Sequence, residues 1–475
     1  MSSIHPACDS VAAQCAKAAP PGPHPNLVLT TTILASALAF VDGSVVNVAL
    51  PTLAKNFNAD AGALQWVINS YLLPLSALLL LGGAAGDHFG RRRLLILGTS
   101  VFALASLGCA LAPNLPALFE SRLIQGIGAA VLLPNSLAIL GQTFSGESKG
   151  RAIGIWAATG AAMAAIGPVI GGWLIDLGSW RAIFLLNLPL ASGAIILAWR
   201  FVPHDRHTEA YPLDATGGVL ATIGLAALTW ALTIGASPRG WTPAAMAAAA
   251  VAVPLLLIFL RFETMRGGRA MMPMHLFASK GFVGLTIFTL LLYAAMGGLL
   301  VLLPYVLIKA AGYSATAAGA ALLPMPLILA LTSPSAGALA ARIGARTPLA
   351  IGPLVVATGF LLALRIDSNA DYWTRVLPMI VIIALGMSAA VAPLTTAVLT
   401  SVDQVHTGSA SGLNSAVART GGLVATALLG SVLAAEGERL LVAFHVSMGV
   451  GALVCAAASL SALTLLGGNR STPSK

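Results

Sequence analysis

Apolar blocks of about twenty residues, separated by short polar segments, follow one another along almost the whole chain. A helix of about 20 mostly apolar residues is long enough to cross the roughly 30 Å hydrocarbon core of a bilayer. The strands of a membrane barrel would instead alternate apolar and polar positions over about ten residues. The pattern therefore predicts an all-α polytopic membrane protein.

The positions of these blocks predict fourteen membrane spans. Their bounds are 27–52, 63–85, 94–112, 117–142, 150–174, 181–200, 214–235, 242–262, 281–308, 315–340, 347–366, 373–397, 408–433 and 441–466. Residues 1–26 hold several prolines, no apolar core and almost no basic residues, so we expect a flexible tail and not a signal peptide. A second tail is expected at 467–475.

The composition agrees with this class. Charged residues make up 9% of the chain and hydrophobic ones 57%, whereas a soluble domain carries about 25% charged residues. The longest predicted interior loop, 201–213, is too short for a catalytic or signalling domain, and no G-x4-G-K-[ST] phosphate-binding string is present. The four cysteines show no metal-ligand spacing. These features argue against an enzyme, and no metal or other cofactor is predicted.

The basic residues predict the orientation. If the N-terminus lies inside, most of the 25 lysines and arginines fall in cytoplasmic segments, and only Arg122 and Arg419 lie inside spans. This bias follows the positive-inside rule for an even number of spans, with both termini and both tails in the cytoplasm. The net charge of +9 is therefore a topology signal. Because the charges are scattered over many short loops, a nucleic-acid partner is not expected.

The chain also repeats itself. Four residues of the first half recur in the second, as Gly83, Gly90, Arg92 and Gly98 fall on Gly337, Gly344, Arg346 and Gly352. At nearly the same offset, Gly150, Gly154 and Gly172 fall on Gly408, Gly412 and Gly430. We predict two six-helix halves, 27–200 and 281–466, joined by a linker segment, 201–280, that holds two extra spans. Transporters built from such repeats bind substrate where the halves meet. Chance matches among the 49 glycines are the alternative.

Four short strings resemble the signature motifs of one transporter family. They are G-A-A-G-D-H-F-G-R-R-R (83–93), F-V-D-G-S-V-V-N-V-A-L-P (40–51), R-L-I-Q-G-I-G-A-A (122–130) and G-A-A-M-A-A-I-G-P-V-I-G-G-W (160–173). On these strings the chain from 27 to 466 resembles the major facilitator superfamily, in particular its fourteen-helix drug:proton antiporter branch of the EmrB/QacA type. The resemblance implies a major facilitator fold and a secondary active transporter that exports amphipathic drugs or toxic compounds in exchange for protons by alternating access.

Asp42 and Arg122 are the candidate proton-coupling residues. An ionised carboxylate at mid-span costs about 3 kcal/mol, so Asp42 should face a wet cavity or a partner. Bonding to neighbouring backbone or to Asn47 is the structural alternative. Arg122 stays charged and needs a counter-charge or water, unless its long stem extends to the membrane surface. The resemblance implies that Arg122 faces the cavity and tunes the coupling carboxyl.

The resemblance implies a conformational latch in the loop after the second span, formed by Gly86, Asp87, Gly90, Arg91 and Arg92. There Asp87 would close the cytoplasmic side by meeting the positive N-terminus of the helix that starts near Gly408. The matching position of the second half is Ala341, so the latch would be one-sided. A local salt bridge with Arg91 or Arg92 is the alternative.

Small residues in the fifth span form the antiporter motif that the resemblance implies: Gly160, Gly167, Pro168, Gly171 and Gly172. Glycines let two helices approach closely, and by resemblance this face packs against the other half. Ordinary tight helix packing is the alternative.

Further polar residues are candidates to line a substrate cavity. They are Asn47, Asn69, Tyr71, Gln125, Asn135, Tyr293, Tyr305 and Arg419. The expected partners are a small amphipathic substrate, protons and the lipid bilayer of the inner (cytoplasmic) cell membrane, while a periplasmic adaptor is left open. A dedicated exporter of one metabolite, lipid or antibiotic on the same fold is the alternative function.

Overall fold

The computed structural model describes residues 24–203, 214–267, 270, 272, 274–402 and 407–466, and all regular structure in these ranges is helical. Apart from 24–26, the predicted tails 1–26 and 467–475 lie outside the described residues, and so does 204–213 of the predicted linker.

Short polar turns separate the described helices, and polar caps start several of them. The helices are α2 (Pro25–Phe57), α3 (Ala61–Phe89), α4 (Arg91–Leu111), α5 (Leu115–Thr143), α6 (Gly146–Asp176), α7 (Ala182–Leu185), α8 (Asn187–Phe201), α9 (Ala215–Gly235), α10 (Pro243–Arg266), η2 (Met274–Ala278), α11 (Lys280–Lys309), α12 (Ala315–Ala321), α13 (Pro324–Ile343), α14 (Arg346–Leu362), η3 (Ala363–Arg365), η4 (Tyr372–Val376), α15 (Leu377–Thr400), α16 (Thr407–Ala427), α17 (Gly430–Leu433) and α18 (Glu438–Leu465). Asp60 caps α3 and Asn114 caps α5, each by accepting a bond from a backbone N–H of the first turn.

Thirteen helical segments in the described part of the chain are long and apolar enough to cross a membrane. They correspond to thirteen of the predicted spans and confirm an all-α, multi-pass membrane protein. The fourteenth predicted span, 408–433, corresponds to α16 and α17. There Asn414, Arg419 and several hydroxyl side chains lower the apolar content, so its crossing of the membrane stays a prediction, as does the orientation of the termini.

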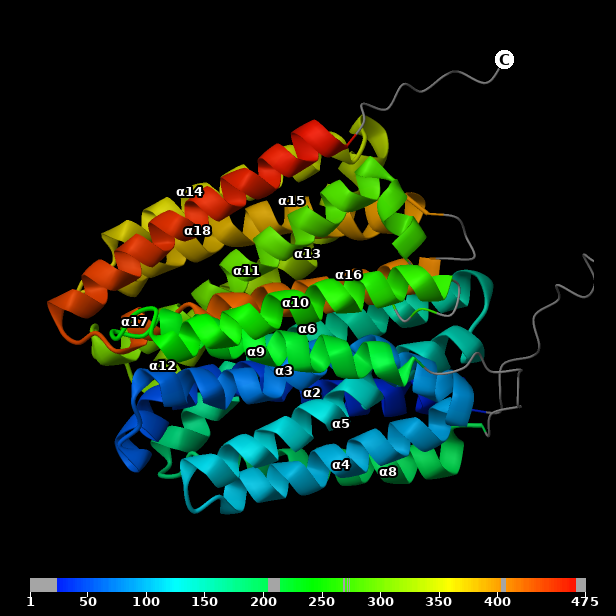
Figure 1. Ribbon diagram of the computed structural model, residues 1–475, viewed down its shortest axis with the longest axis horizontal. Coiled ribbons are helices and arrows are strands. Elements are labelled where there is room, and N and C mark those ends of the chain that lie inside the picture. The colour runs from blue at the N-terminus through cyan, green and yellow to red at the C-terminus, as the bar shows by residue number, and fades with distance from the viewer. Residues whose placement is uncertain are drawn as a thin grey trace, which may run out of the picture.

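Successive long helices run in opposite directions, so the bundle has two ends (Figure 1). We call the end with the loop Gly86–Arg93 the motif end. The opposite end, where Asn58 ends α2 and Ser314 begins α12, is the far end. In Figure 1 the helices from the N-terminal part of the chain, blue to cyan, lie below those from its C-terminal part, yellow to red.

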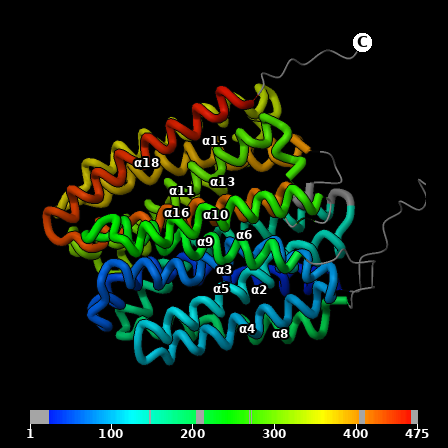
Figure 2. Tube along the Cα trace, in the orientation of Figure 1, coloured from blue at the N-terminus to red at the C-terminus, as the bar shows by residue number. Residues whose placement is uncertain are grey.

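The two additional helices, α9 and α10, pack against each other on the outside of the bundle, as Figure 2 shows in green. α9 contacts both α3 and α16, and Trp230 of α9 packs against Trp66 of α3. The pair therefore covers the line where the N-terminal and C-terminal groups of helices meet, and it is not part of either predicted six-helix half.

The helix contacts repeat as the sequence does. A Cβ atom added to a glycine shows how close the next helix lies. On Gly98 of α4 it would lie 3.0 Å from the backbone oxygen of Gly128 on α5. On Gly352 of α14 it would lie 2.9 Å from the backbone oxygen of Gly386 on α15. Both pairs of helices thus approach closely through glycine, and the resemblance of the two halves extends from sequence to packing.

The two repeated arginines make the same contact in their own halves. Arg92, at the start of α4, donates to the backbone oxygen of Trp199 near the end of α8. Arg346, at the start of α14, donates at 2.5 Å to that of Leu463 near the end of α18. The last carbonyl groups of a helix lack hydrogen-bond donors within the helix. Each arginine supplies such a donor to the last helix of its half.

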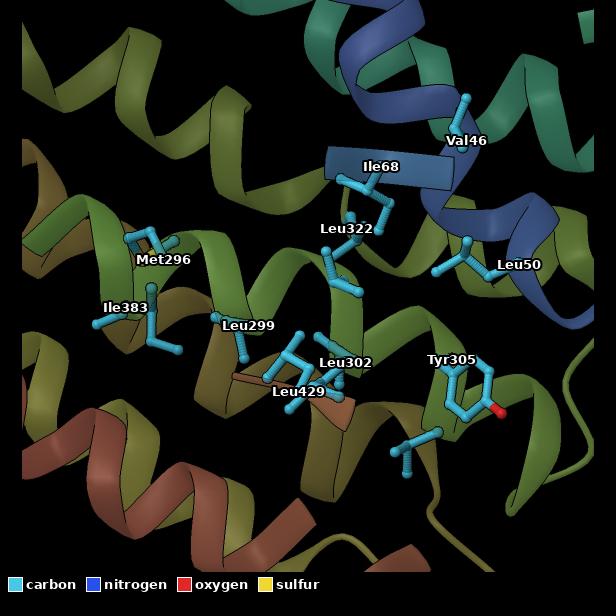
Figure 3. Packing of buried hydrophobic residues seen from close by; sticks show 14 of the residues in the cluster. Val46, Leu50, Ile68, Met296, Leu299, Leu302, Tyr305, Leu322, Ile383 and Leu429 are labelled. Atoms are coloured by element: carbon cyan, nitrogen blue, oxygen red, sulfur yellow. The ribbon is translucent and has the colours of Figure 1, made fainter. Parts of the chain in front are cut away.

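At the far end the two groups of helices share one apolar core. Val46 and Leu50 of α2 and Ile68 of α3 pack in the same buried cluster as Leu302 of α11 and Leu322 after α12 (Figure 3). Burial of this surface favours the contact of the two groups by about 25 cal/mol per Å² of apolar area.

Candidate functional site

Asp42 lies in the middle of α2, and its side chain is completely buried. One carboxylate oxygen pairs with the guanidinium of Arg122 on α5. The other accepts hydrogen bonds from Nε2 of Gln125 at 2.8 Å and from Nδ2 of Asn187, at the start of α8, at 3.2 Å. Donors from neighbouring helices thus bind both oxygens, as a charge buried away from water requires.

Arg122 is also bound on several sides. Its Nη1 donates to Oε1 of Gln125 at 2.7 Å, and its Nε donates to the backbone oxygen of Val67 on α3 at 3.2 Å. Its central carbon lies 4.3 Å from the ring centroid of Tyr71, within cation–π distance. The structure therefore shows Arg122 with a buried counter-charge and not extended to the membrane surface.

Two polar residues that the sequence does not single out complete this network. Oγ of Ser106, on α4, accepts from Nε2 of Gln125 at 2.8 Å and from Nδ2 of Asn187 at 3.2 Å. A single Ser or Asn in an apolar span commonly serves helix packing, so neither residue carries a distinctive signal. The network joins α2, α4, α5 and α8 and lies inside the N-terminal group of helices.

The two charges of the buried pair depend on each other. While Asp42 is ionised the two charges compensate each other. Protonation of Asp42 leaves Arg122 as an uncompensated buried charge, at a cost of about 3–5 kcal/mol. Among the described residues, no group of three or more His, Cys, Asp or Glu is placed to hold a metal ion.

The predicted latch loop joins α3 to α4. Gly90 adopts φ 99°, a value that favours glycine, where one helix passes into the next. Asp87 is 57% exposed and pairs with Arg91 at 2.7 Å, while Nη1 of Arg91 donates to the backbone oxygen of Ala138 on α5 at 3.1 Å. The structure therefore shows the local salt bridge, and a contact of Asp87 with the start of α16 stays a prediction.

Gly86 and Asn135 form a close contact between α3 and α5. A Cβ on Gly86 would lie 1.6 Å from Oδ1 of Asn135, so no larger residue fits while Asn135 keeps this position. Nδ2 of Asn135 donates to the backbone oxygen of Gly82 at 2.9 Å, and the side chain is completely buried. The structure thus places this candidate cavity residue in a helix–helix contact.

The glycines of α6 lie on two faces of the helix. Three of them face α2, a helix of the same half. An added Cβ would lie 2.6 Å from the Phe40 side chain at Gly160, 2.3 Å from that of Ser44 at Gly167, and 2.1 Å from that of Val45 at Gly171. A Cβ on Gly172 would lie 2.3 Å from the backbone oxygen of Ala315, at the start of α12. Only part of the motif therefore faces the other half.

The contact between α6 and α12 is reciprocal. A Cβ on Gly319 of α12 would lie 2.2 Å from the backbone oxygen of Pro168. Next to it, Oδ2 of Asp176 accepts bonds from the backbone N–H of Thr316 at 3.0 Å and from its hydroxyl at 2.5 Å. Glycine lets the two backbones meet at the far end, where a carboxylate then caps the start of α12.

A second contact between the halves is polar and completely buried. Nε2 of Gln65, on α3, donates to the backbone oxygens of Thr426 and Ala427 at the end of α16, each at 2.8 Å. The hydroxyl of Thr426 donates to Oδ1 of Asn69, one turn further along α3. We call these four residues the clasp. Asn69, a candidate cavity residue, therefore holds α3 to α16.

The four other cavity candidates differ in their surroundings. Asn47 is buried in α2, and the hydroxyl of Tyr305 donates to the backbone oxygen of Leu433 at 3.1 Å. Tyr293, on α11, and Arg419, on α16, are both half-buried. The two helices meet close to these residues, since a Cβ on Gly421 would lie 2.6 Å from the backbone oxygen of Leu290.

The sequence between residues 32 and 426 matches the model of the Major Facilitator Superfamily. The chain belongs to this superfamily. Its members are transporters, so the match agrees with the expectation of a protein that is not an enzyme.

Several relatives of this superfamily member carry names that refer to drug or antibiotic resistance. The "Multidrug resistance protein Stp" of Mycobacterium tuberculosis is 34% identical over 416 residues, which are 86% of this chain and 76% of that protein. The "Methylenomycin A resistance protein" of Bacillus subtilis is 32% identical over 86% of this chain and 87% of its own length. The "Puromycin resistance protein pur8" of Streptomyces alboniger is 32% identical over 90% and 85%.

Solved structures share the fold of this superfamily member at low sequence identity. A peptide transporter POT in complex with sulfate superposes with a TM-score of 0.69 at 15% identity, over 95% of this chain and 97% of that one. A bacterial homolog to the human lysosomal transporter Spinster, in an inward-facing and occupied conformation, gives a TM-score of 0.65 at 15% identity, over 93% and 96%.

Proposed function

We propose that this protein is a proton-coupled exporter of small amphipathic drugs or toxic compounds, of the fourteen-helix drug:proton antiporter branch, in the cytoplasmic membrane. The names of its relatives support drug export. The observation that carries the proton coupling is the buried ion pair of Asp42 on α2 and Arg122 on α5, which also forms hydrogen bonds with α3 and α8.

Coupling requires that proton and substrate bias one conformational equilibrium in opposite directions. Protonation of Asp42 would free Arg122, which is bonded to the backbone of α3. α3 also carries Gln65 of the clasp, so a shift of this helix would act on the contact between the halves. We therefore propose that the proton site biases alternating access without touching the substrate.

The contacts between the halves support a conformation that is closed at the far end. The clasp and the α6–α12 contact both lie there. At the motif end, by contrast, Asp87 is more than half exposed. We infer that the motif end faces the cytoplasm and that this conformation admits substrate from that side.

The test is export driven by an imposed pH gradient in vesicles that contain the purified protein. Asp42→Asn keeps the shape of the side chain but cannot exchange a proton, so we expect proton-driven export to stop while the protein still inserts. Glu120→Gln is the matched control, because Glu120 is an exposed carboxyl on α5, two residues before Arg122. Normal proton-driven export by Asp42→Asn would remove Asp42 from the mechanism.

A dedicated exporter of one antibiotic is the second candidate, because two relatives are named for resistance to a single compound. Resistance to a panel of dyes, biocides and antibiotics in a pump-deficient host distinguishes the two. Protection against one compound only would establish the dedicated exporter.

A further inference from the structure

Arg419 is a charged residue in the middle of a predicted span. It lies near the centre of α16 and is half-buried. No carboxylate of the described residues lies within ion-pair distance of it, since the ion pairs found there join other residues. An ionisable residue at such a depth faces the interior of the bundle or water, and commonly marks the path of a substrate.

The position of Arg419 is a junction of the two halves. α16 packs against α3 of the first half and α11 of the second. Tyr71 lies on α3, and Tyr293 lies on the stretch of α11 that meets α16 next to Arg419, since a Cβ on Gly421 would lie 2.6 Å from the backbone oxygen of Leu290 and 3.1 Å from the backbone nitrogen of Ala294. The hydroxyl of Tyr71 already donates to the backbone oxygen of Ala39, whereas Tyr293 is half-buried on the helix that packs against α16.

Asp42 does not compensate this charge. Arg122, Gln125 and Asn187 already bind its two oxygens, and the side chain is completely buried within the first half. Asp42 and Arg122 neutralise each other, whereas Arg419 has no ion-pair partner among the described residues. The junction is therefore electropositive, and it attracts anions and repels cations.

We propose that Arg419 and Tyr293 form a subsite for the anionic group of the exported compound, and that the preferred substrates are amphipathic monoanions such as aromatic carboxylic acids. This inference rests on the proposed export function. A guanidinium presents two parallel N–H donors that match a carboxylate. The tyrosine ring packs against the apolar body of the same molecule.

Three pyrene probes test this proposal on the purified full-length protein: 1-pyrenebutyric acid, 1-pyrenebutanol and 1-pyrenebutylamine. They share an apolar body and differ in charge. We expect wild type to bind the acid most tightly and the amine least. Loss of a charge-assisted hydrogen bond weakens binding by about 10- to 100-fold. Arg419→Gln should therefore bind the acid about 10- to 100-fold more weakly than wild type does, and bind the alcohol with nearly unchanged affinity.

Two further variants make the result specific. Arg419→Lys keeps the charge but not the paired donors, so the acid should bind with intermediate affinity. Arg239→Gln is the matched control, because Arg239 is an exposed arginine in the turn between α9 and α10, and its loss should leave the order of the probes unchanged.

The proposal is overturned if wild type binds the alcohol or the amine as tightly as the acid, or if Arg419→Gln weakens all three probes equally. These binding measurements need no gradient, so they are independent of the export function. If wild type binds the acid best but no probe or drug is exported under a pH gradient, the anion subsite stands and the proposed function fails.

Discussion

Gln65 makes the most direct polar link between the two halves. Its Nε2 donates to two backbone oxygens at the end of α16, those of Thr426 and Ala427, and all of these groups are buried. Gln65→Leu removes both bonds but keeps a side chain of similar size. When the far end opens, water can satisfy the freed groups, so these bonds stabilise the closed arrangement only.

The magnitude follows from the two hydrogen bonds. Each bond between uncharged groups contributes about 0.5–1.5 kcal/mol net. Together they bias the far end toward closure by about 1–3 kcal/mol, which corresponds to roughly a 5- to 150-fold change in the equilibrium between closed and open. The backbone oxygen of Thr426 keeps the N–H of Leu429 at 3.2 Å, whereas that of Ala427 loses its Gln65 partner in the closed state, which increases the effect because a buried unsatisfied group carries its full desolvation cost.

Distances between spin labels report this equilibrium. Lys55, near the end of α2, and Lys309, at the end of α11, are exposed at the far end and belong to opposite halves. We expect Gln65→Leu to shift the distance distribution of this pair toward longer values. Labels at Arg93 and Arg342, exposed at the motif end, should move closer together, because alternating access closes one end as the other opens.

The matched control is Gln142→Leu, an equivalent change at an exposed position of α5, which should leave both distributions as in wild type. If Gln65→Leu gives the distributions of wild type at both ends, the clasp does not determine the closure of the far end.

Two more perturbations test other contacts. Gly172→Val should abolish export, because a Cβ added at this position would lie 2.3 Å from the backbone oxygen of Ala315. Gly154→Ala should export normally, because the space around its Cβ is open. Equal export by both variants would contradict a close α6–α12 contact. In the loop between η3 and η4 at the far end, the hydrogen bond from Arg375 lowers the pKa of Asp367. The ionised carboxylate therefore stabilises the fold at a pH above its unfolded-state pKa of about 3.9. This contribution is lost as the pH falls through the lower pKa of the folded state. Asp367→Asn should therefore lower the Tm at pH 7 but not at a pH below both values, and a Tm difference that persists at low pH would refute the assignment.

The spans could be predicted because the length of an apolar block is set by the bilayer and needs no knowledge of neighbours. The same reasoning is weakest for α16, where Asn414 and Arg419 interrupt the block. The length of an apolar block also predicts one continuous helix for each of the spans 181–200 and 315–340. The structure divides the first into α7 and α8 and the second into α12 and α13. Local turns of this kind leave the average hydrophobicity unchanged.

The site could be predicted only in part. Asp42 and Arg122 stand out because a charge at mid-span requires a partner, and the structure brings the two together. Asn69 and Asn135 are polar, but the sequence does not tell how their helices are rotated, and successive helical residues differ in direction by about 100°. Both side chains lie in helix–helix contacts.

One short segment of α3 connects the features on which the proposed function depends. The backbone oxygen of Val67 and the ring of Tyr71 bind Arg122, while Gln65 and Asn69 bind the end of α16. A helix of seven residues or so is a rigid unit, so a movement that frees Arg122 displaces the clasp as well. Coupling therefore needs no long pathway: the charge pair and the contact between the halves share about two helical turns.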